Sequence, residues 1–153
     1  MPVVVETLQS LSDLVGREIA ATEWFSVTQD HIQRFAEVID DRQWIHVDRE
    51  RAARESPYGT TIAHGFLTLS LLTRLMKEAI QIRNGVRMGV NYGFNRVRFP
   101  SAVRAGSKIR GHFTLRSLKE VSGGLEAVFD VKVESEGSDK PCCVAEWVLR
   151  YYS

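Results

Sequence analysis

Acidic and imidazole side chains lie close together in one short stretch of this chain. Asp40 and Asp41 come just before His46, in a segment with the polar character of a loop. A carboxylate and an imidazole held together are typical of a general acid/base pair. The chain then passes through a turn that contains Pro57 and Gly59 and enters its most apolar segment. This order predicts an acid/base pair that faces the N-terminus of a helix.

The same residues also have structural interpretations. His46 can be hydrogen-bonded for structure alone, and Asp41 can end a helix or stabilise a turn. Asp40 competes with Asp41 for the role of the acid, whereas Asp48 fits better as the N-cap of a following helix. The residue types alone leave these alternatives open.

Composition places the chain among ordinary soluble globular proteins. It has 153 residues, of which 44% are hydrophobic and 25% charged, and its formal net charge is +1. The length suits one domain over residues 1–153. The balanced charge gives no support to a nucleic-acid or membrane-surface role, and no apolar run approaches a membrane span of ~20 residues. We interpret a loose basic zone as a solvated strand face; it comprises Arg96, Arg98, Arg104, Lys108 and Arg110.

Cys142 and Cys143 are the only cysteines. Neighbours in a strand point to opposite faces and rarely bridge each other, so we expect no disulfide framework. The paired CxxC signature of a metal site is missing from the sequence, and so are the basic region and long apolar stretch of a signal peptide. These observations favour a reduced, cytoplasmic compartment.

The first half of the chain contains several residues that are typical of helix starts and helix ends. Thr7 can cap a short helix that ends at Gly16, and Thr28 can cap a second helix that ends near Asp40. Asp48 can cap a short charged helix.

The strongest element is a predicted helix over residues 61–82. At ~1.5 Å per residue it is roughly 30 Å long. Its apolar stripe is wide over the first turns, which indicates an enclosed helix. The stripe consists of Ile62, Phe66, Leu69, Leu72, Leu75, Met76, Ala79 and Ile80.

Most of the chain outside these predicted helices is predicted to form strands. Their alternation changes phase near Gly93 and Asn95, which predicts a bulge. The order of elements favours an α+β fold in which a curved antiparallel sheet wraps around one long central helix. The predicted strands cover residues 18–27, 87–99, 108–115, 125–134 and 142–152.

Three motifs, in order, resemble a known family. The loop that ends in Ile45-His46-Val47-Asp48 is similar to the hydratase motif of MaoC-like enzymes, Gly-Asp-x-Asn-Pro-x-His. Thr61-Ile62-Ala63-His64-Gly65-Phe66 and Asn95-Arg96-Val97-Arg98-Phe99-Pro100 continue the match. Together they resemble the (R)-specific enoyl-CoA hydratases and dehydratases, in the NodN-like branch, from about Gly16 to the end. The chain departs from the pattern in two places, because Asp40 replaces the usual Gly and Gln43-Trp44 replace Asn-Pro.

The resemblance implies a hot-dog fold and a homodimer with its sites near the subunit interface. It also implies a hydro-lyase of the enoyl-CoA hydratase 2 type that acts on acyl thioesters of CoA or an acyl carrier protein, without a further cofactor. By motif position, Asp41 and His46 form the catalytic pair that activates one water. The implied reaction is syn addition of water to a trans-2-enoyl thioester, which gives the (R)-3-hydroxyacyl product, or the reverse dehydration. Which of the two is the formal base stays open.

Other residues of the motifs suggest further roles. An unpaired backbone N–H at the start of a helix can stabilise an enolate oxygen, so we expect Gly65 to be an oxyanion donor; close packing is the alternative for this glycine. His64 is expected to be structural or to line the substrate site. Trp44 and Ile62 are candidates for the acyl tunnel, whereas core packing is the better interpretation of Phe66. Zinc is not expected, because no ligand pair has convincing spacing.

Two other functions remain open at this point. A hot-dog thioesterase would act on the same thioesters but release free thiol. A non-catalytic subunit would bind acyl thioesters and work with a partner chain.

Overall fold

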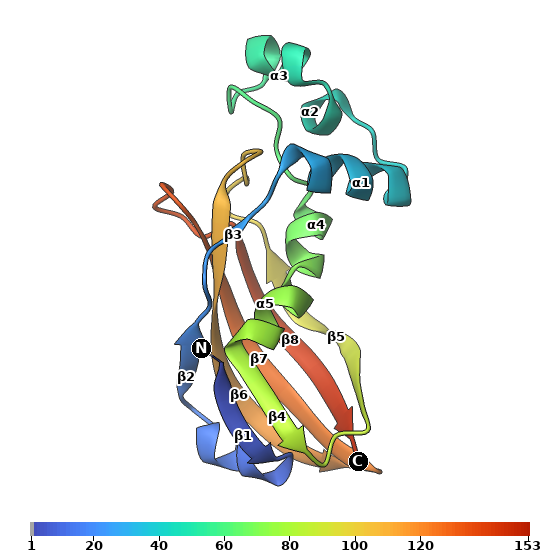
Figure 1. Ribbon diagram of the computed structural model, residues 1–153, viewed down its shortest axis with the longest axis vertical. Helices are drawn as coiled ribbons and strands as arrows, with labels where there is room; N and C mark the ends of the chain where they lie inside the picture. The colour runs from blue at the N-terminus through green and yellow to red at the C-terminus, as the bar shows by residue number, and fades with distance from the viewer. Residues whose placement is uncertain (1) are drawn as a thin grey trace.

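An antiparallel sheet forms the body of the protein in the computed structural model, which describes residues 2–153. The strand order is β2-β6-β7-β8-β5, and β3 also pairs with β6. The sheet curves behind a helix that crosses one of its faces, as predicted (Figure 1). The strands are β2 (Glu18–Ala21), β3 (Phe25–Ser26), β5 (Met88–Arg98), β6 (Lys108–Val121), β7 (Gly124–Ser135) and β8 (Cys143–Tyr152).

The central helix is shorter than predicted. It consists of α4 (Gly65–Ser70) and α5 (Leu72–Ala79), which meet at Leu71, so the expected span of 61–82 was wrong at both ends. Residues 61–64 are extended because the Ala63 N–H donates to Val103 O and Thr61 O accepts from the Ala105 N–H. Pairing with a neighbouring segment has overridden the helical spacing of the apolar residues.

The C-terminal end of the predicted helix is a strand instead. β4 (Ile80–Asn84) pairs in parallel with β1 (Val3–Thr7), and the sequence reading had no strand at either place. β1 consists mostly of β-branched residues, and this composition was the signal from which a strand could have been predicted. The short helix after β1 is a 3₁₀ helix, η1 (Gln9–Leu14), and Gly16 follows it with φ 83°.

The predicted strand over residues 18–27 is two short strands. β2 and β3 both pair with β6, and the chain leaves the ladder between them. There the Thr22 hydroxyl accepts a hydrogen bond from the Gly111 N–H. The bulge predicted near Gly93 and Asn95 is confirmed, because the register of β5 against β8 shifts at 91–93 and again at 94–96.

Alternating side chains of β6 and β7 build the core against α5. Phe113 and Phe129 are fully buried, as is Leu75 of the helix. Cys142 and Cys143 are free thiols, and both are buried. No helix among residues 2–153 has the length and apolar character that crossing a membrane requires.

Three helices lie together beyond one end of the sheet (Figure 1). They are α1 (Gln29–Ile39), α2 (Trp44–Val47) and α3 (Arg49–Glu55). Thr28 and Asp48 cap α1 and α3 through their side chains, as predicted. α1 ends at Asp40, whose φ of 55° turns the chain sharply toward Asp41.

Candidate active site

Asp41 and His46 meet where α1, α2 and the extended segment before α4 come together. The left-handed turn at Asp40 starts the connection, and one turn of helix then brings His46 back toward Asp41. His46 is therefore helical, whereas we expected an irregular loop. Asp41 Oδ2 lies 4.0 Å from His46 Nε2, and their side chains are 34% and 10% exposed. The two reactive atoms are close but not in direct hydrogen-bond contact.

The protonation of His46 follows from its partners. His46 Nδ1 lies 2.7 Å from the backbone oxygen of Ile62. A carbonyl oxygen can only accept, so Nδ1 carries the proton and Nε2 presents a lone pair toward Asp41. Burial lowers the pKa of His46 below its usual 6.5, against the effect of the Ile62 hydrogen bond. The ring is therefore neutral at pH 7.

Asp41 is held as a carboxylate. Burial alone would raise its pKa, but hydrogen bonds from the backbone and side chain of Gln43 and the nearby imidazoles together lower the pKa below its usual 3.8. The Gln43 side chain lies 3.2 Å from Asp41 Oδ1. Gln43, one of the residues that depart from the family motif, thus holds the Asp41 carboxylate in place through Oδ1. The other oxygen, Oδ2, stays turned toward His46.

Gln29 connects the segments that carry the Asp41/His46 pair through two side-chain hydrogen bonds. Its amide nitrogen donates to the backbone oxygen of His46 at 2.8 Å, and its amide oxygen accepts from the Thr61 hydroxyl. One side chain on α1 therefore links α2 to the segment that leads into α4. The sequence reading missed Gln29, because a single glutamine in the first turn of a helix carries no motif.

His64 packs behind the pair rather than opening to substrate. The residue is 3% exposed, and its ring stacks on His46 with centroids 3.8 Å apart and planes at 22°. His64 Nε2 lies 2.9 Å from the backbone oxygen of Asp41, to which it donates. Within residues 2–153, His64 Nδ1 is a fully buried atom without a hydrogen-bond partner. His64 thus contacts both members of the pair.

The three side chains come close enough together to raise the question of a metal. Ligand atoms of Asp41, His46 and His64 lie within 4.8 Å of one another. A metal binds in the plane of an imidazole, about 2.0–2.1 Å from its nitrogen in the case of zinc. The two stacked rings direct their lone pairs along roughly parallel planes, so one ion cannot lie in both. The geometry suits an acid/base pair better than a metal centre.

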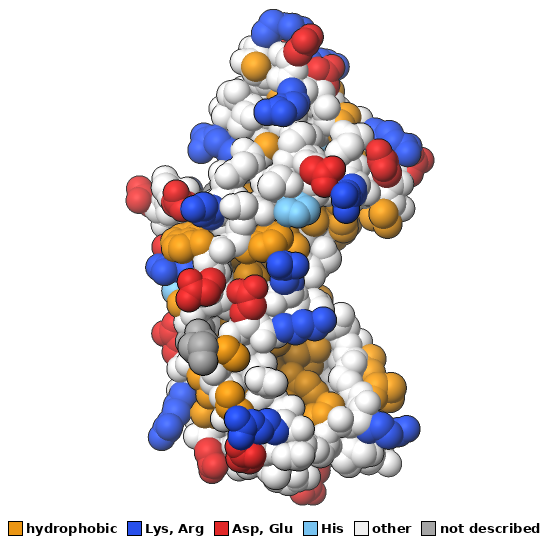
Figure 2. All heavy atoms as spheres, in the orientation of Figure 1, with side chains coloured by type: hydrophobic (Ala, Val, Ile, Leu, Met, Phe, Trp, Pro, Cys, Tyr) orange, Lys and Arg blue, Asp and Glu red, His pale blue; other side chains and the backbone are white. Residues whose placement is uncertain are grey.

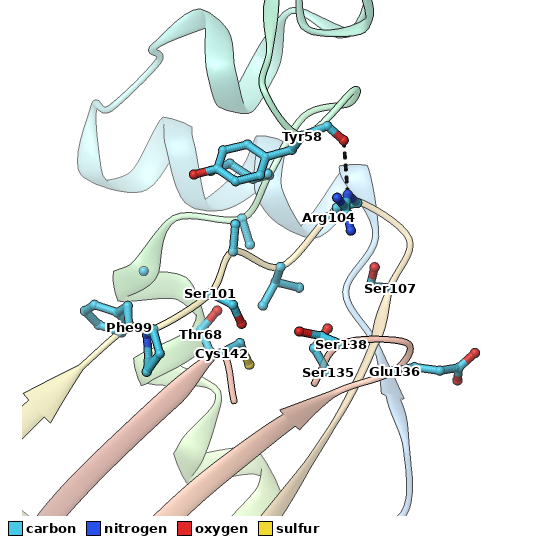
Figure 3. A pocket seen from close by; sticks show the side chains of 16 residues that line it. Tyr58, Thr68, Phe99, Ser101, Arg104, Ser107, Ser135, Glu136, Ser138 and Cys142 are labelled. Carbon is cyan, nitrogen blue, oxygen red and sulfur yellow. Dashed lines mark hydrogen bonds between the residues drawn. The ribbon is translucent and has the colours of Figure 1, made fainter. Parts of the chain in front are cut away.

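Gly65 and Ile62 line a cavity beside the pair. Its volume is about 560 Å³, and Asp41 and His46 are not among its lining residues. It lies between the start of α4, the connection after β5 and the turn between β7 and β8 (Figure 3). A Cβ on Gly65 would lie 3.2 Å from ring carbons of Phe99, so the missing side chain lets this ring pack closely against the helix N-terminus.

Two sequence candidates lie elsewhere. Trp44 of α2 packs against Arg51 of α3, whose guanidinium carbon is 4.3 Å from the centre of the indole ring. Trp44 lines neither this cavity nor the apolar cavity beside α5. Phe66 is 67% exposed, so its assignment to the core was wrong for the isolated chain.

Comparison with known proteins decides the family. The sequence matches the family described as MaoC like domain over residues 10–136. It is 44% identical over 151 residues to 3-hydroxyacyl-thioester dehydratase Z of Mycobacterium tuberculosis, covering 96% of this chain and 99% of that protein. The chain belongs to the MaoC-like family. Its enzyme class is accordingly that of the hydro-lyases.

Two further similarities agree with the MaoC-like assignment. Nodulation protein N of Rhizobium meliloti is 43% identical over 143 residues, with 93% of this chain and 89% of that protein covered. The structure of R-hydratase PhaJ1 from Pseudomonas aeruginosa superposes with a TM-score of 0.72 at 20% identity, over 91% of this chain and 82% of that one. The MaoC-like chain therefore has the hot-dog fold, as the motif resemblance implied.

Proposed function

We propose that this MaoC-like hydro-lyase adds water reversibly to trans-2-enoyl thioesters and forms the (R)-3-hydroxyacyl product. The observation that carries the proposal is the pair of acceptors, Asp41 Oδ2 and His46 Nε2, at 4.0 Å. The names of two similar proteins, a 3-hydroxyacyl-thioester dehydratase and an R-hydratase, support it.

A water molecule fits between the two acceptors. Both are proton acceptors, since Asp41 is ionised and the proton of His46 is on Nδ1. Two hydrogen bonds of about 2.8 Å that meet at the angle of a water molecule, about 105°, span roughly 4.4 Å. One water can therefore donate to both groups and turn its oxygen lone pairs toward substrate.

The two proton transfers then need no group beyond the pair. As the water oxygen bonds to C3, one of its protons passes to the Asp41/His46 pair. A proton from the pair goes to C2, so the pair ends in its starting state and both atoms reach one face of the double bond. We leave the formal base unassigned between the two. Since no electrons enter or leave, the proposal includes no redox cofactor.

Charge develops on the thioester oxygen during this addition. We assign the Gly65 N–H as its donor, because Gly65 is the first residue of α4 and N–H groups in the first turn of a helix have no intrahelical partner. The missing side chain lets the carbonyl approach.

The acyl group has an apolar site along the same helix. A cavity of about 750 Å³ lies beside α5, and Met76, Ile80, Val90 and Leu149 are among its lining residues. Figure 2 shows hydrophobic side chains in a hollow of the surface below the overhanging helices. Apolar walls of this size suit a hydrocarbon chain.

The partner of this chain is proposed to be a second copy. Within residues 2–153, β5 pairs only with β8, which leaves one edge of the sheet and an apolar face uncovered. Contiguous exposed apolar surface is typical of an interface. We therefore propose a homodimer, which works in the reducing cytoplasm where Cys142 and Cys143 stay thiols. The exposed side chains are Met88 (46%), Val90 (39%), Tyr92 (60%), Phe94 (37%), Phe99 (41%) and Phe66 (67%).

A hydration assay across enoyl-CoA chain lengths tests the reaction. We expect crotonyl-CoA to lose its conjugated double bond and to give (R)-3-hydroxybutyryl-CoA by chiral chromatography. Free thiol is measured in parallel. Thiol release without hydration would show a thioesterase, and tight binding of the acyl-CoA without turnover would show a binding subunit.

A further inference from the structure

His64 contacts both members of the catalytic pair, but the proposed reaction gives it no role. It is 3% exposed and is not among the residues that line the cavity beside Gly65 or the apolar cavity beside α5. A substrate bound in these cavities would therefore not contact it. Its Nδ1 is buried without a hydrogen-bond partner within residues 2–153, which weakens the folded state. An apolar side chain would avoid this penalty, so stability alone does not account for an imidazole here.

One nitrogen of His64 holds the backbone of Asp41. His64 Nε2 donates to the backbone oxygen of Asp41 at 2.9 Å, and the Asp41 N–H donates to the backbone oxygen of Ala36 at 3.1 Å. Asp41 lies past the end of α1, so its carbonyl oxygen has the bond from His64 in place of a helical one. The end of α1 and the His64 ring thus hold the peptide groups on both sides of the Asp41 side chain.

The face of the same ring supports His46. The two imidazoles are stacked, with centroids 3.8 Å apart and planes at 22°. The bond from His46 Nδ1 to the Ile62 oxygen holds one side of the His46 ring, but the ring can still tilt about that bond. Contact with the His64 ring restricts this tilt and keeps Nε2 directed toward Asp41. His64 itself packs against Phe35 of α1, with ring centroids 5.3 Å apart.

His64 also joins Asp41 to the start of α4. It is the N-cap residue of this helix, and Gly65 follows it directly. The segment before α4 reaches His46 through the Ile62 oxygen, and it reaches Asp41 through the His64 ring. Within residues 2–153, no other hydrogen bond joins Asp41 to this segment. The ring therefore sets the distance between Asp41 and the proposed oxyanion donor.

We propose that His64 is a positioning residue for the hydration reaction. Its Nε2–H holds Asp41 and its ring face holds His46, so that both keep a fixed place relative to the Gly65 N–H. The inference rests on the proposed function, which supplies the reaction that the geometry serves. Displacement of a catalytic group by about 1 Å is sufficient to lose on the order of a hundredfold in rate. His64 therefore acts on kcat without touching the substrate.

Two variants separate the hydrogen bond from the ring. His64→Gln keeps an N–H donor at the position of Nε2, whereas His64→Phe keeps a flat ring without a donor. We expect His64→Phe to lower kcat for crotonyl-CoA hydration at least about tenfold, and His64→Gln to stay within about threefold of wild type. KM should change less than about twofold in both, since ground-state binding does not involve His64. Wild-type kcat in His64→Phe, or equal losses in the two variants, would overturn the inference.

Folding and a second histidine serve as controls. Chemical denaturation establishes that each variant is folded under the assay conditions. The side chain of His64→Asn is too short to reach the Asp41 oxygen, so this variant should lose kcat as His64→Phe does, and it replaces His64→Phe if the phenyl ring prevents folding. His112→Gln removes an imidazole on β6 that bonds Glu18 and Glu134, and it should leave kcat and KM unchanged. An equal loss of kcat in His112→Gln would show a general effect of stability and defeat the inference.

Nitrogen-15 NMR of the imidazole rings tests the geometry without substrate. At pH 7, Nε2 of His64 should carry a proton, whereas Nε2 of His46 should not. The chain has four histidines, so the spectra of His64→Gln and His46→Gln assign both rings. An unprotonated His64 Nε2 would overturn the inference. If both tautomers are found but no enoyl thioester is hydrated, the proposed function is wrong rather than the arrangement of His64.

Discussion

At the scale of single residues, the two members of the pair have complementary charge states. Asp41 has its pKa lowered and His46 is kept neutral, so both can accept a proton at pH 7. Titratable groups with shifted pKa values that lie close together are typical of functional sites. Burial keeps His46 neutral, and the Ile62 carbonyl holds its proton on Nδ1. Hydrogen bonds from Gln43 help to keep Asp41 ionised.

The pH dependence of kcat/KM should come from His46. Its lowered pKa means that the ring accepts a proton only below pH 6.5, and protonation removes the Nε2 lone pair. Activity should therefore be flat near pH 7 and fall with unit slope at some pH below 6.5. Asp41 stays ionised throughout, because its pKa lies below 3.8. An acid limb centred above pH 6.5 would contradict this account.

Sequence reasoning reached the pair but not its surroundings. Asp41 and His46 were found by the spacing of a motif, and the structure brings them together. His64 was expected to be structural or to line the substrate site, and it is buried between Phe35 and His46. Burial of a side chain depends on neighbours far along the chain, which one sequence segment does not contain.

At the scale of elements, Gln29 should couple stability to activity. Gln29→Leu removes the bonds to His46 O and the Thr61 hydroxyl, so we expect a loss of about 1–3 kcal/mol in the free energy of unfolding and a lower kcat. Chemical denaturation and initial rates measure the two effects. Gln33→Leu on the same helix is the matched control. The proposed coupling is wrong if both glutamine variants behave alike.

The proposed role of the Gly65 N–H as oxyanion donor can be tested separately. Gly65→Ala places a Cβ 3.2 Å from Phe99, a half-exposed ring that can shift, so unfolding free energy should fall by only ~1 kcal/mol. The added methyl group should nevertheless lower kcat by at least about tenfold, since it obstructs the carbonyl. Ser70→Ala in the same helix is the control. Full activity of the Gly65→Ala variant would contradict the proposal that the Gly65 N–H is the oxyanion donor.

The elements were predicted unevenly, for a physical reason. Capped helices and alternating strands, such as those that start at Thr28 and Leu125, were found because their signals are local. The ends of the central helix were not found. Ile80 and Ile62 continue its apolar spacing, but backbone pairing with β1 and with the 103–105 segment makes both regions extended.

At the scale of the whole molecule, the uncovered face of β5 should hold two copies together. Tyr92→Asp introduces a charge at a side chain that is 60% exposed, and burying that charge in an interface is costly. We expect sedimentation equilibrium to give a dimer for wild type and a monomer for Tyr92→Asp. Ser117→Asp on β6 should remain a dimer. A monomeric wild-type protein would refute the proposed assembly.

The central claim is that Asp41 and His46 share the water that adds to the enoyl thioester. The most direct measurement is the rate of crotonyl-CoA hydration by Asp41→Asn and His46→Gln, with Asp40→Asn as the neighbouring control. Removing an acid/base group should cost at least about a hundredfold in kcat in each of the first two variants. Asp40→Asn should stay near wild type. Near wild-type hydration by Asp41→Asn or His46→Gln would contradict the mechanism.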